Sequence, residues 1–364
     1  MTLTEVVADE VASIGVFRLR LPLLEPFRAS HGVESTRELI LVKWERGDGY
    51  VGWGECPTLT RPTYTAEYTE GAFHLLTSWV VPSLVAGQVE LPRGWPMLSS
   101  ALRTAALDAR LRSEDLSLRS YLGATTESVP AGAVLGEVAD LDELVRRAEE
   151  QVAAGAALLK LKIRPGYDTQ PLRAIRIAWP EIAVAADANG SYRTPDDLAG
   201  LQDLDLTYLE QPLPVNDLLG HQELCRRGVT VALDESIVDR DAALLSVRLG
   251  AAQVFSIKPA RVGGVESSRE IRDVAVDAGI GLFCGGMLET AVGRATALAV
   301  AAMPGFGYPT DLGPSGRYFT RDVAAPVVRD PNGSIPVPGG PGIGVEPEPE
   351  RLVELTVDER SFTP

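Results

Sequence analysis

Five charged side chains recur at a nearly constant interval along this 364-residue chain. Each follows a short apolar run, and an amphipathic stretch comes after each run, so one interval spans one strand and one helix. Successive members are separated by 25, 23, 24 and 24 residues: Lys162, Asp187, Glu210, Asp234 and Lys258. The same position therefore recurs at the C-terminal end of five consecutive strands, where barrel enzymes gather their catalytic residues.

Eight apolar runs of this kind fill the middle of the chain. They start at Val129, Leu158, Ile182, Thr207, Thr230, Val254, Ile280 and Phe306. The runs are largely apolar rather than alternating, which is typical of strands buried on both faces of a parallel sheet. Consecutive β-then-α units predict an α/β fold, a TIM-type barrel of seven or eight such units.

The first third of the chain has a different pattern. Residues 11–23 and 38–56 alternate apolar and polar positions around a Gly-Asp-Gly turn at Gly47–Gly49, which predicts antiparallel strands. Helical spacing follows over residues 66–82 and 99–122. A segment rich in proline and glycine, 331–349, is expected to pack back on this first domain. We predict three parts: an α+β domain over 1–128, a barrel over 129–325 and a C-terminal tail over 326–364.

The counts of histidine and cysteine narrow the chemistry. The chain has three histidines, each without a partner at metal-ligand spacing, so a histidine triad or zinc site would need distant partners. The three cysteines lie far apart, which disfavours disulfides and cysteine-bound metals. We therefore expect acid–base chemistry to use carboxylates and lysines.

The charge balance limits the possible partners. With 34 basic and 50 acidic residues the net charge is −16, which argues against binding nucleic acid or an anionic membrane. The acidic N-terminal residues do not resemble a signal peptide, and no apolar run approaches the roughly 20 residues that span a bilayer. We expect a cytoplasmic protein that acts on a small molecule and, like many large barrel enzymes, forms a homo-oligomer.

The three carboxylates at neighbouring strand ends predict a metal site. Each alone has an ordinary structural explanation, since a strand-end aspartate often caps a helix and a glutamate can pair with an arginine. In the same register, however, three carboxylates repel one another unless a cation lies among them. Ligands that are all oxygen favour a hard divalent ion, Mg²⁺ first, with Mn²⁺ or another divalent ion as a substitute.

Two lysines would flank this metal site, because strands four apart face each other across a barrel. A divalent ion between Lys162 and Lys258 can neutralise the enolate that forms when a proton leaves the carbon beside a carboxylate. A lysine acts as a base only when neutral, and nearby cations lower its pKa. Lys160 lies two residues before Lys162, on the same strand face, and can bind a substrate carboxylate oxygen.

An ordered series of motifs carries a family resemblance. The barrel half contains K-L-K at 160–162, then D-A-N, L-E-Q-P, L-D-E-S, I-K-P and G-G-M-L-E-T. The rest of the chain contains PFRASHG (26–32), GWGEC (52–56), PTYTAEY (62–68) and VPGGPGIGV (337–345). Together these motifs resemble the muconate-lactonizing subgroup of the enolase superfamily, and within it the family of o-succinylbenzoate synthases and N-acylamino-acid racemases.

The resemblance implies a role for each matching residue. Asp187, Glu210 and Asp234 would bind Mg²⁺, and Lys162 and Lys258 would be the acid–base pair. It also implies that a further set of residues binds the substrate or supports the residues that do: Lys160, Asn189, Glu235, Arg261, Gly285, Gly286, Met287 and Leu288. Of these, Lys160 and Asn189 would orient the carboxylate, Glu235 would lie behind them, and residues 285–288 would line the substrate's far end.

The resemblance also implies how the first domain is used. It would cap the barrel, be completed by the C-terminal tail, and close over the barrel mouth with loops at Phe27–Gly32 and Cys56–Tyr64. With Arg261, in K-P-A-R-V-G-G, the chain resembles the branch of the family in which racemase activity accompanies synthase activity. Val134 departs from the family, where a small hydroxyl residue is common, and this departure bears on specificity.

Three functions follow as hypotheses. The first is o-succinylbenzoate synthase, which performs a syn dehydration in menaquinone biosynthesis. The second is racemisation of N-succinyl or other N-acyl amino acids through the same enolate, by this enzyme or a dedicated racemase; cycloisomerases and dipeptide epimerases are similar enzymes. The third is a barrel that binds metal and ligand without turnover, or a metal-free Schiff-base lysine enzyme, which two opposed lysines and three carboxylates fit poorly.

Overall fold

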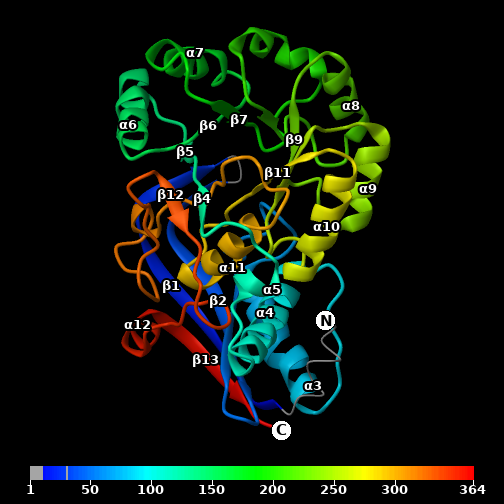
Figure 1. Ribbon diagram of the computed structural model, residues 1–364, viewed down its shortest axis with the longest axis vertical. Helices are drawn as coiled ribbons and strands as arrows, with labels where there is room; N and C mark the ends of the chain where they lie inside the picture. Colours follow the sequence, from blue (N-terminus) through cyan, green and yellow to red (C-terminus); the bar gives the residue numbers. More distant parts are fainter. Residues whose placement is uncertain (1–10, 30–31) are drawn as a thin grey trace.

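The computed structural model describes residues 11–29 and 32–364. Within that part, an antiparallel sheet lies beside a curled parallel sheet covered by helices (Figure 1). The expected α/β barrel with an α+β capping domain is therefore confirmed. The acidic residues 1–10 and two members of the loop Phe27–Gly32, Ser30 and His31, lie outside the described residues. The domain limits at 128 and 325 stay a prediction.

The antiparallel sheet has the strand order β13-β1-β2-β3. Its strands are β1 (Val11–Ala29), β2 (Gly32–Arg46), β3 (Val51–Cys56) and β13 (Thr356–Phe362). The predicted turn Gly47–Gly49 joins β2 to β3, and Gly49 has a φ of +86°. β13 pairs with β1 from Ile14↔Phe362 onward, so segments about 340 residues apart in sequence complete one sheet.

The helix α4 (Pro96–Ser113) packs unusually close to β3. A Cβ atom on Gly52 would lie 2.1 Å from the carbonyl oxygen of Ala105, and one on Gly54 would lie 2.0 Å from that of Ala101. Only glycine permits this approach, which explains the two glycines of the GWGEC motif in packing terms. The close contact fixes the end of β3, from which Glu55 and the segment after Cys56 extend toward the barrel.

The helical regions of the first domain are more broken than the sequence predicts. Residues 66–82 become α2 (Thr69–Leu75), a π-helical turn (Leu76–Val80) and α3 (Val81–Val85). The helix predicted over 99–122 ends with α4 at Ser113, and α5 (Leu118–Tyr121) begins after it. Asp115 has a φ of +51°, and Ser117 caps α5 by accepting a hydrogen bond from Ser120 N (3.1 Å), so a turn interrupts the helix.

The parallel sheet contains seven strands that are neighbours in chain order. They are β5 (Ala133–Leu135), β6 (Leu159–Lys162), β7 (Val184–Asp187), β8 (Leu209–Glu210), β9 (Val231–Leu233), β10 (Val254–Ile257) and β11 (Gly281–Cys284). The elements between and after them are α6 (Leu141–Ala153), α7 (Thr169–Ala178), the 3₁₀ helix η2 (Pro195–Leu204), α8 (Leu218–Arg226), α9 (Arg240–Leu249), α10 (Val265–Asp277) and α11 (Ala291–Ala301).

The eighth apolar run closes the ring without forming a regular strand. Phe306 bridges to Leu282 of β11, and Thr310 bridges to Ala131 just before β5, both in parallel. Pro309 between them has no N–H to donate, which limits regular pairing. The remaining elements are β4 (Ser128–Pro130), η3 (Ser315–Arg317), β12 (Ser334–Pro336) and α12 (Pro349–Leu355), and β12 pairs with β4.

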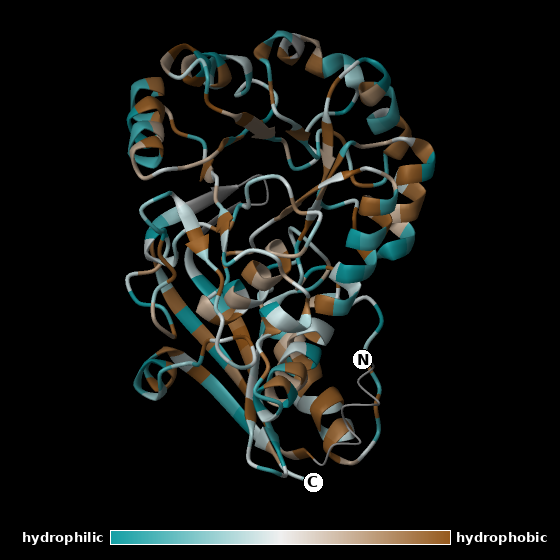
Figure 2. Ribbon diagram, in the orientation of Figure 1, coloured by the Kyte–Doolittle hydropathy of each residue, from teal (hydrophilic) through white to brown (hydrophobic). Residues whose placement is uncertain are grey.

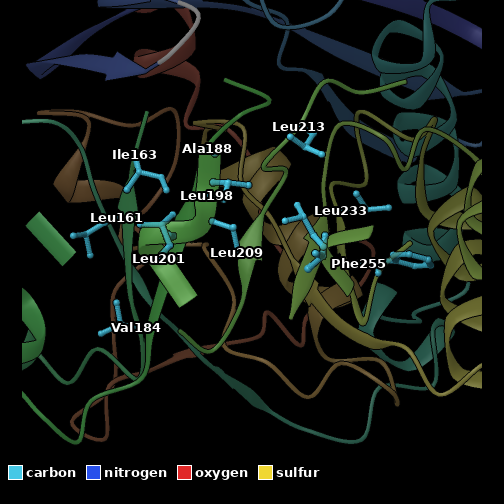
Figure 3. Packing of buried hydrophobic residues seen from close by; sticks show 14 of the residues in the cluster. Leu161, Ile163, Val184, Ala188, Leu198, Leu201, Leu209, Leu213, Leu233 and Phe255 are labelled. Atoms are coloured by element: carbon cyan, nitrogen blue, oxygen red, sulfur yellow. The ribbon is translucent and has the colours of Figure 1, made fainter. Parts of the chain in front are cut away.

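Side chains along each barrel strand point alternately into two apolar layers. Figure 2 shows brown, apolar residues on the strands and teal, polar residues on the outer faces of the helices. One layer lies between sheet and helices and includes Leu161, Val184, Leu209 and Leu233 of the strands. Figure 3 shows Leu161 and Leu209 close to Leu198 and Leu201 of η2. The other fills the barrel interior: Leu158, Ala185, Tyr208, Ala232, Val254 and Phe283. Residues two positions later on the inward face therefore point into the barrel mouth.

No helix in the described part of the chain is both long and apolar enough to cross a membrane.

Candidate active site

The predicted strand-end residues meet at the carboxyl end of the parallel sheet. Lys162 is the register partner of Asp187, and Asp187 is the partner of Glu210. Asp234 lies two residues beyond Ala232, the partner of Glu210. The regular spacing in sequence thus becomes a row of adjacent side chains in space.

Each of the three carboxylates forms an ion pair with a lysine. The pairs are Lys162 Nζ–Asp187 Oδ2 at 2.6 Å, Lys160 Nζ–Glu210 Oε2 at 2.5 Å and Lys258 Nζ–Asp234 Oδ2 at 2.8 Å. Within residues 11–29 and 32–364, no three carboxylate, cysteine or histidine side chains form a ready-made ion cage. The site alternates positive and negative groups along the sheet edge.

The donor set nevertheless fits a divalent cation. Glu210 is fully buried, and its Oε1 atom has no hydrogen-bond partner among the described residues. Burial raises the pKa of Glu210 well above its usual range, and the neighbouring Asp187 carboxylate raises it further. A cation held by Asp187, Glu210 and Asp234 would engage the free oxygen and relieve this repulsion.

The lysines hold the two aspartates ionised. Burial opposes ionisation of Asp187, but Lys162 and Lys160 outweigh it and lower its pKa. Burial likewise opposes ionisation of Asp234, and Arg261 and Lys258 hold its pKa well below the usual range. Burial alone would lower the pKa of Lys258, but Asp234 raises that pKa well above its usual value.

Asn189 links one lysine to a second carboxylate. Its Oδ1 accepts a hydrogen bond from Lys162 Nζ (2.9 Å), and its Nδ2 donates to Glu235 Oε1 (2.8 Å). Asn189 has a φ of +43°, a left-handed conformation that asparagine tolerates better than most residues. Burial and the neighbouring Asp234 raise the pKa of Glu235 to about 7. Asp187 and Asn189 therefore both hold Lys162 Nζ in place.

Arg261 lies behind Asp234, buried among protein acceptors. Its Nη1 donates to Asp234 Oδ1 and its Nη2 to the Asp234 carbonyl oxygen (2.7 Å). Nη1 also donates to the hydroxyl of Tyr64 (2.8 Å), which accepts from Lys258 Nζ (2.9 Å) as well. The loop Cys56–Tyr64 thus brings a side chain of the first domain to the charged row. Tyr64 lay within the predicted loop but was not singled out, because a lone tyrosine in a loop carries no spacing.

Two acidic residues of the site were missed by the sequence reasoning. Asp311 pairs with Lys160 Nζ from the eighth apolar run. Glu289, in the motif G-G-M-L-E-T, accepts a hydrogen bond from Met287 N (2.7 Å) and is 3% exposed. Asp311 is the charged residue within the last apolar run, which starts at Phe306, so a search of that run for a charged side chain would have found it. Glu289 follows its strand by five residues and breaks the series.

A cavity of about 70 Å³ opens at this row of charges. Its lining includes Lys160, Lys162, Asp187 and Lys258 of the charged row. The rest of the wall comprises Val134, Gly286, Leu288, Glu289, Arg294, Asp311, Leu312 and Tyr318. The lining of the cavity therefore combines cations and carboxylates with the aliphatic side chains of Val134, Leu288 and Leu312.

The structure separates the four residues 285–288 that the sequence groups together. Gly286 and Leu288 line the cavity, whereas Met287 packs into an apolar cluster of the first domain. A Cβ atom on Gly285 would lie 2.7 Å from Lys258 Cε, so glycine makes room for that lysine. Leu288 has a φ of +54°, which is uncommon for leucine.

Comparisons with known proteins identify the family of this chain. Residues 143–351 match the family described as Enolase C-terminal domain-like. The chain is 40% identical to an N-succinylamino acid racemase of an Amycolatopsis species, over 95% of this chain and 98% of that protein. It is 35% identical to the o-succinylbenzoate synthase of Bacillus subtilis (strain 168), over 93% and 94%.

A solved structure shows the same fold over nearly the full length. It is described as a probable mandelate racemase from Alicyclobacillus acidocaldarius, and it superposes with a TM-score of 0.90 at 36% identity. The match covers 97% of this chain and 98% of that chain. The resemblance inferred from the motifs is thereby confirmed.

Proposed function

This chain belongs to the enolase superfamily, among the o-succinylbenzoate synthases and N-acylamino-acid racemases, and from that premise we propose that it is a Mg²⁺-dependent enzyme that removes a proton alpha to a carboxylate through an enolate. One observation carries the proposal: Lys162 and Lys258, from β6 and β10, line the same cavity on either side of the carboxylate row. An α-carbon between them is accessible to a base from both faces.

Asp187, Glu210 and Asp234 are the residues that would hold the divalent ion. When bound, Mg²⁺, or Mn²⁺ in its place, supplies positive charge that offsets the charge developing on the substrate carboxylate. Lys160 and Asn189 orient that carboxylate, and Glu235 holds Asn189 through its hydrogen bond of 2.8 Å. These residues leave the α-carbon facing the lysines.

The two lysines divide the proton chemistry. Lys162, as the neutral amine, takes the α-proton, and the contacts of its Nζ with Asp187 and Asn189 fix the direction of the side chain. In a syn dehydration to o-succinylbenzoate, Lys258 stabilises the enolate by its charge, and protonated Lys162 returns its proton to the hydroxyl group on the same face, which leaves as water. In racemisation of an N-succinyl amino acid, Lys258 delivers a proton to the opposite face. Both reactions use the same intermediate, so one protein can catalyse both.

We place o-succinylbenzoate synthase first, as a step of menaquinone biosynthesis, with N-succinylamino acid racemase as a second activity. The relatives carry both names, and both lysines reach the cavity, as two-base racemisation requires. A dedicated racemase, or another muconate-lactonizing-type enzyme such as a cycloisomerase or dipeptide epimerase, is the alternative.

A side-by-side assay tests this proposal. The purified protein is incubated with the succinyl-hydroxycyclohexadiene carboxylate precursor and with a panel of N-succinyl amino acids, in Mg²⁺ and after treatment with EDTA. We expect turnover of at least one substrate class with Mg²⁺, loss of activity in the chelator, and recovery on adding Mg²⁺ or Mn²⁺. Full activity after complete removal of divalent ions, or no turnover of either class with Mg²⁺, would contradict the proposal.

A further inference from the structure

Arg37, on β2 of the antiparallel sheet, is fully buried and contacts backbone from both halves of the molecule. Its Nη1 donates to the Thr58 carbonyl oxygen (2.6 Å) and its Nη2 to that of Pro57 (2.5 Å). Nη2 also donates to the carbonyl oxygen of Met287 (3.1 Å), and Nε to that of Leu288 (3.2 Å). One guanidinium group thus joins two segments about 230 residues apart in sequence.

Both segments belong to the walls of the candidate site. Residues 57–58 begin the loop that ends at Tyr64, whose hydroxyl contacts Lys258 and Arg261. Residues 287–288 follow β11, and Leu288 lines the cavity. The left-handed conformation of Leu288 persists only if its surroundings fix it, and the hydrogen bond from Arg37 Nε to its carbonyl oxygen is one such constraint.

A second contact from the antiparallel sheet holds the same barrel loop at its other end. Glu55, on β3, accepts hydrogen bonds from Thr290 N (3.1 Å), Thr290 Oγ1 (2.5 Å) and Gly293 N (3.0 Å), at the start of α11. A side chain at Gly293 would lie 2.9 Å from the Glu55 carboxyl carbon, so glycine leaves room for this contact. The loop 285–290 is therefore positioned by the first domain through Arg37 and Glu55.

We propose that Arg37 is a positioning residue that determines which acyl groups the site accepts, by fixing Leu288 against the loop Cys56–Tyr64. The proposal rests on the proposed function for the identity of the substrates. Leu288 and Val134 contribute aliphatic side chains to the lining of the cavity that Lys162 and Lys258 also line. A shift of Leu288 therefore changes the space for the end of the substrate that does not carry the reacting carbon, and leaves Lys162 in place.

The substitution Arg37→Lys separates this role from general stabilisation. Lysine keeps the positive charge, but its single ammonium group cannot bridge carbonyl oxygens on both segments as the planar fork does. We expect KM for N-succinyl amino acids to rise about tenfold or more and kcat to change much less. The preference for N-succinyl over N-acetyl amino acids should change by about tenfold. A purely structural role would instead lower activity toward both substrates in the same proportion.

Backbone hydrogen exchange provides a readout that needs no substrate. In Arg37→Lys, amides of residues 57–64 and of residues 286–290 should exchange faster together. The matched control is Tyr121→Phe, which removes the hydrogen bond from Tyr121 to Glu266 (2.7 Å), another contact between the first domain and the barrel, away from the cavity. It should change neither the exchange of these two segments nor the acyl preference.

The outcomes distinguish this proposal from the proposed function. If the wild-type protein turns over neither substrate class, the proposed function fails, and the exchange data still decide whether Arg37 couples the two segments. Faster exchange in only one segment, or an unchanged KM and acyl preference in folded Arg37→Lys, would overturn the positioning role. If Arg37→Lys does not fold, Glu55→Gln must speed exchange at 286–290 and raise KM, and failure to do so would also overturn it.

Discussion

At the scale of single residues, the two lysines proposed as acid and base have different surroundings. Lys162 contacts Asp187 and Asn189, and its side chain is 17% exposed. Lys258 contacts Asp234 and the hydroxyl of Tyr64, and its Nζ lies 5.0 Å from the centre of the Tyr64 ring. Among the contacts of the described residues, Lys258 is thus the one of the two lysines that meets a side chain supplied by the first domain.

Replacing each lysine should separate the two reactions. Lys162→Ala should lower kcat/KM for dehydration by about 10²–10⁴-fold, because the general base is lost. Lys258→Ala should abolish racemisation of both enantiomers, since each direction needs a base on one face and an acid on the other. Chiral chromatography and deuterium incorporation from D₂O measure these effects. Racemisation at the wild-type rate in Lys258→Ala would rule out two-base chemistry.

Gly285 offers a test of how closely Lys258 is confined. In Gly285→Ala the new Cβ would lie 2.7 Å from both Lys258 Cε and Ser256 Oγ, so the lysine must move. A displacement of this kind should lower kcat by about 10–100-fold with little loss of Tm. Gly307→Ala is the matched control, because nothing lies within 4 Å of a Cβ at that exposed position. Equal kcat values for the two variants would speak against a confined Lys258.

The sequence could predict the site residues that recur at a regular interval along the chain. It could not predict those that reach the site only because two domains pack together. Asp187, Glu210 and Asp234 follow from a repeated strand-and-helix length, because parallel strands end at one edge. Tyr64 and Arg37 come from another domain, and their contacts depend on how that domain docks. Arg261 stays a prediction as a substrate contact, and its hydrogen bond to the carbonyl oxygen of Asp234 (2.7 Å) also depends on how the chain folds. No local pattern encodes such contacts.

At the scale of elements, the contact between β3 and the start of α11 joins the two domains through one carboxyl group. Glu55 lies at the end of β3 and accepts hydrogen bonds from Thr290 and Gly293. Burial raises the pKa of Glu55 to about 8, and the nearby Glu289 carboxylate also raises it. The contact between β3 and α11 therefore depends on whether Glu55 is protonated, and so on pH.

The pH dependence of stability should reveal this group. An unfolded glutamate releases its proton near pH 4.5, whereas folded Glu55 keeps it up to about pH 8. The folded state therefore binds more protons in this range, and its stabilisation is complete below pH 4.5 and lost as the pH rises through 8. Tm should fall less steeply between pH 5 and 8.5 in Glu55→Gln than in the wild type, a difference on the order of a few kcal/mol in unfolding free energy.

Parallel Tm curves for the two proteins would contradict the raised pKa of Glu55. The comparison isolates Glu55 because Glu67, whose pKa burial raises to about 7, is present in both proteins.

The strands and helices themselves were predictable to different degrees. The apolar runs located the seven strands of the parallel sheet because burial on both faces leaves a strong pattern. The eighth run contains Pro309, and its irregular path depends on hydrogen bonds to Leu282 and Pro130. The helix predicted over 99–122 breaks near Asp115, where a left-handed residue ends a continuous apolar spacing.

At the scale of the whole molecule, the first domain and the barrel form one site rather than two independent units. Met287 of the barrel packs into the apolar cluster of the first domain, and Tyr64 of the first domain reaches Lys258. The strand β13 belongs to the same antiparallel sheet as β2, which carries Arg37. A change that destabilises the antiparallel sheet should therefore also alter the cavity and the binding of substrate.

Removing β13 tests this connection. A variant ending at Leu355 loses the strand that pairs with β1, so Tm should fall by several degrees as paired backbone groups become exposed. Because the sheet positions the loops of the site, KM should rise more than kcat falls. Calorimetry and steady-state kinetics measure the two effects. The matched control is Val357→Thr, an exposed side-chain change that keeps β13, and an unchanged KM in the shortened protein would contradict the link.

The pairing of β13 with β1 also sets an order of events during synthesis. Residues near 360 leave the ribosome after the whole barrel, so β1 must wait for its edge partner while the barrel emerges. The barrel strands pair with their neighbours in chain order and can assemble meanwhile. Until then β1 presents an unpaired edge, a template on which other chains can aggregate. A nascent chain stalled before residue 356 is therefore the form of this protein that most needs a chaperone.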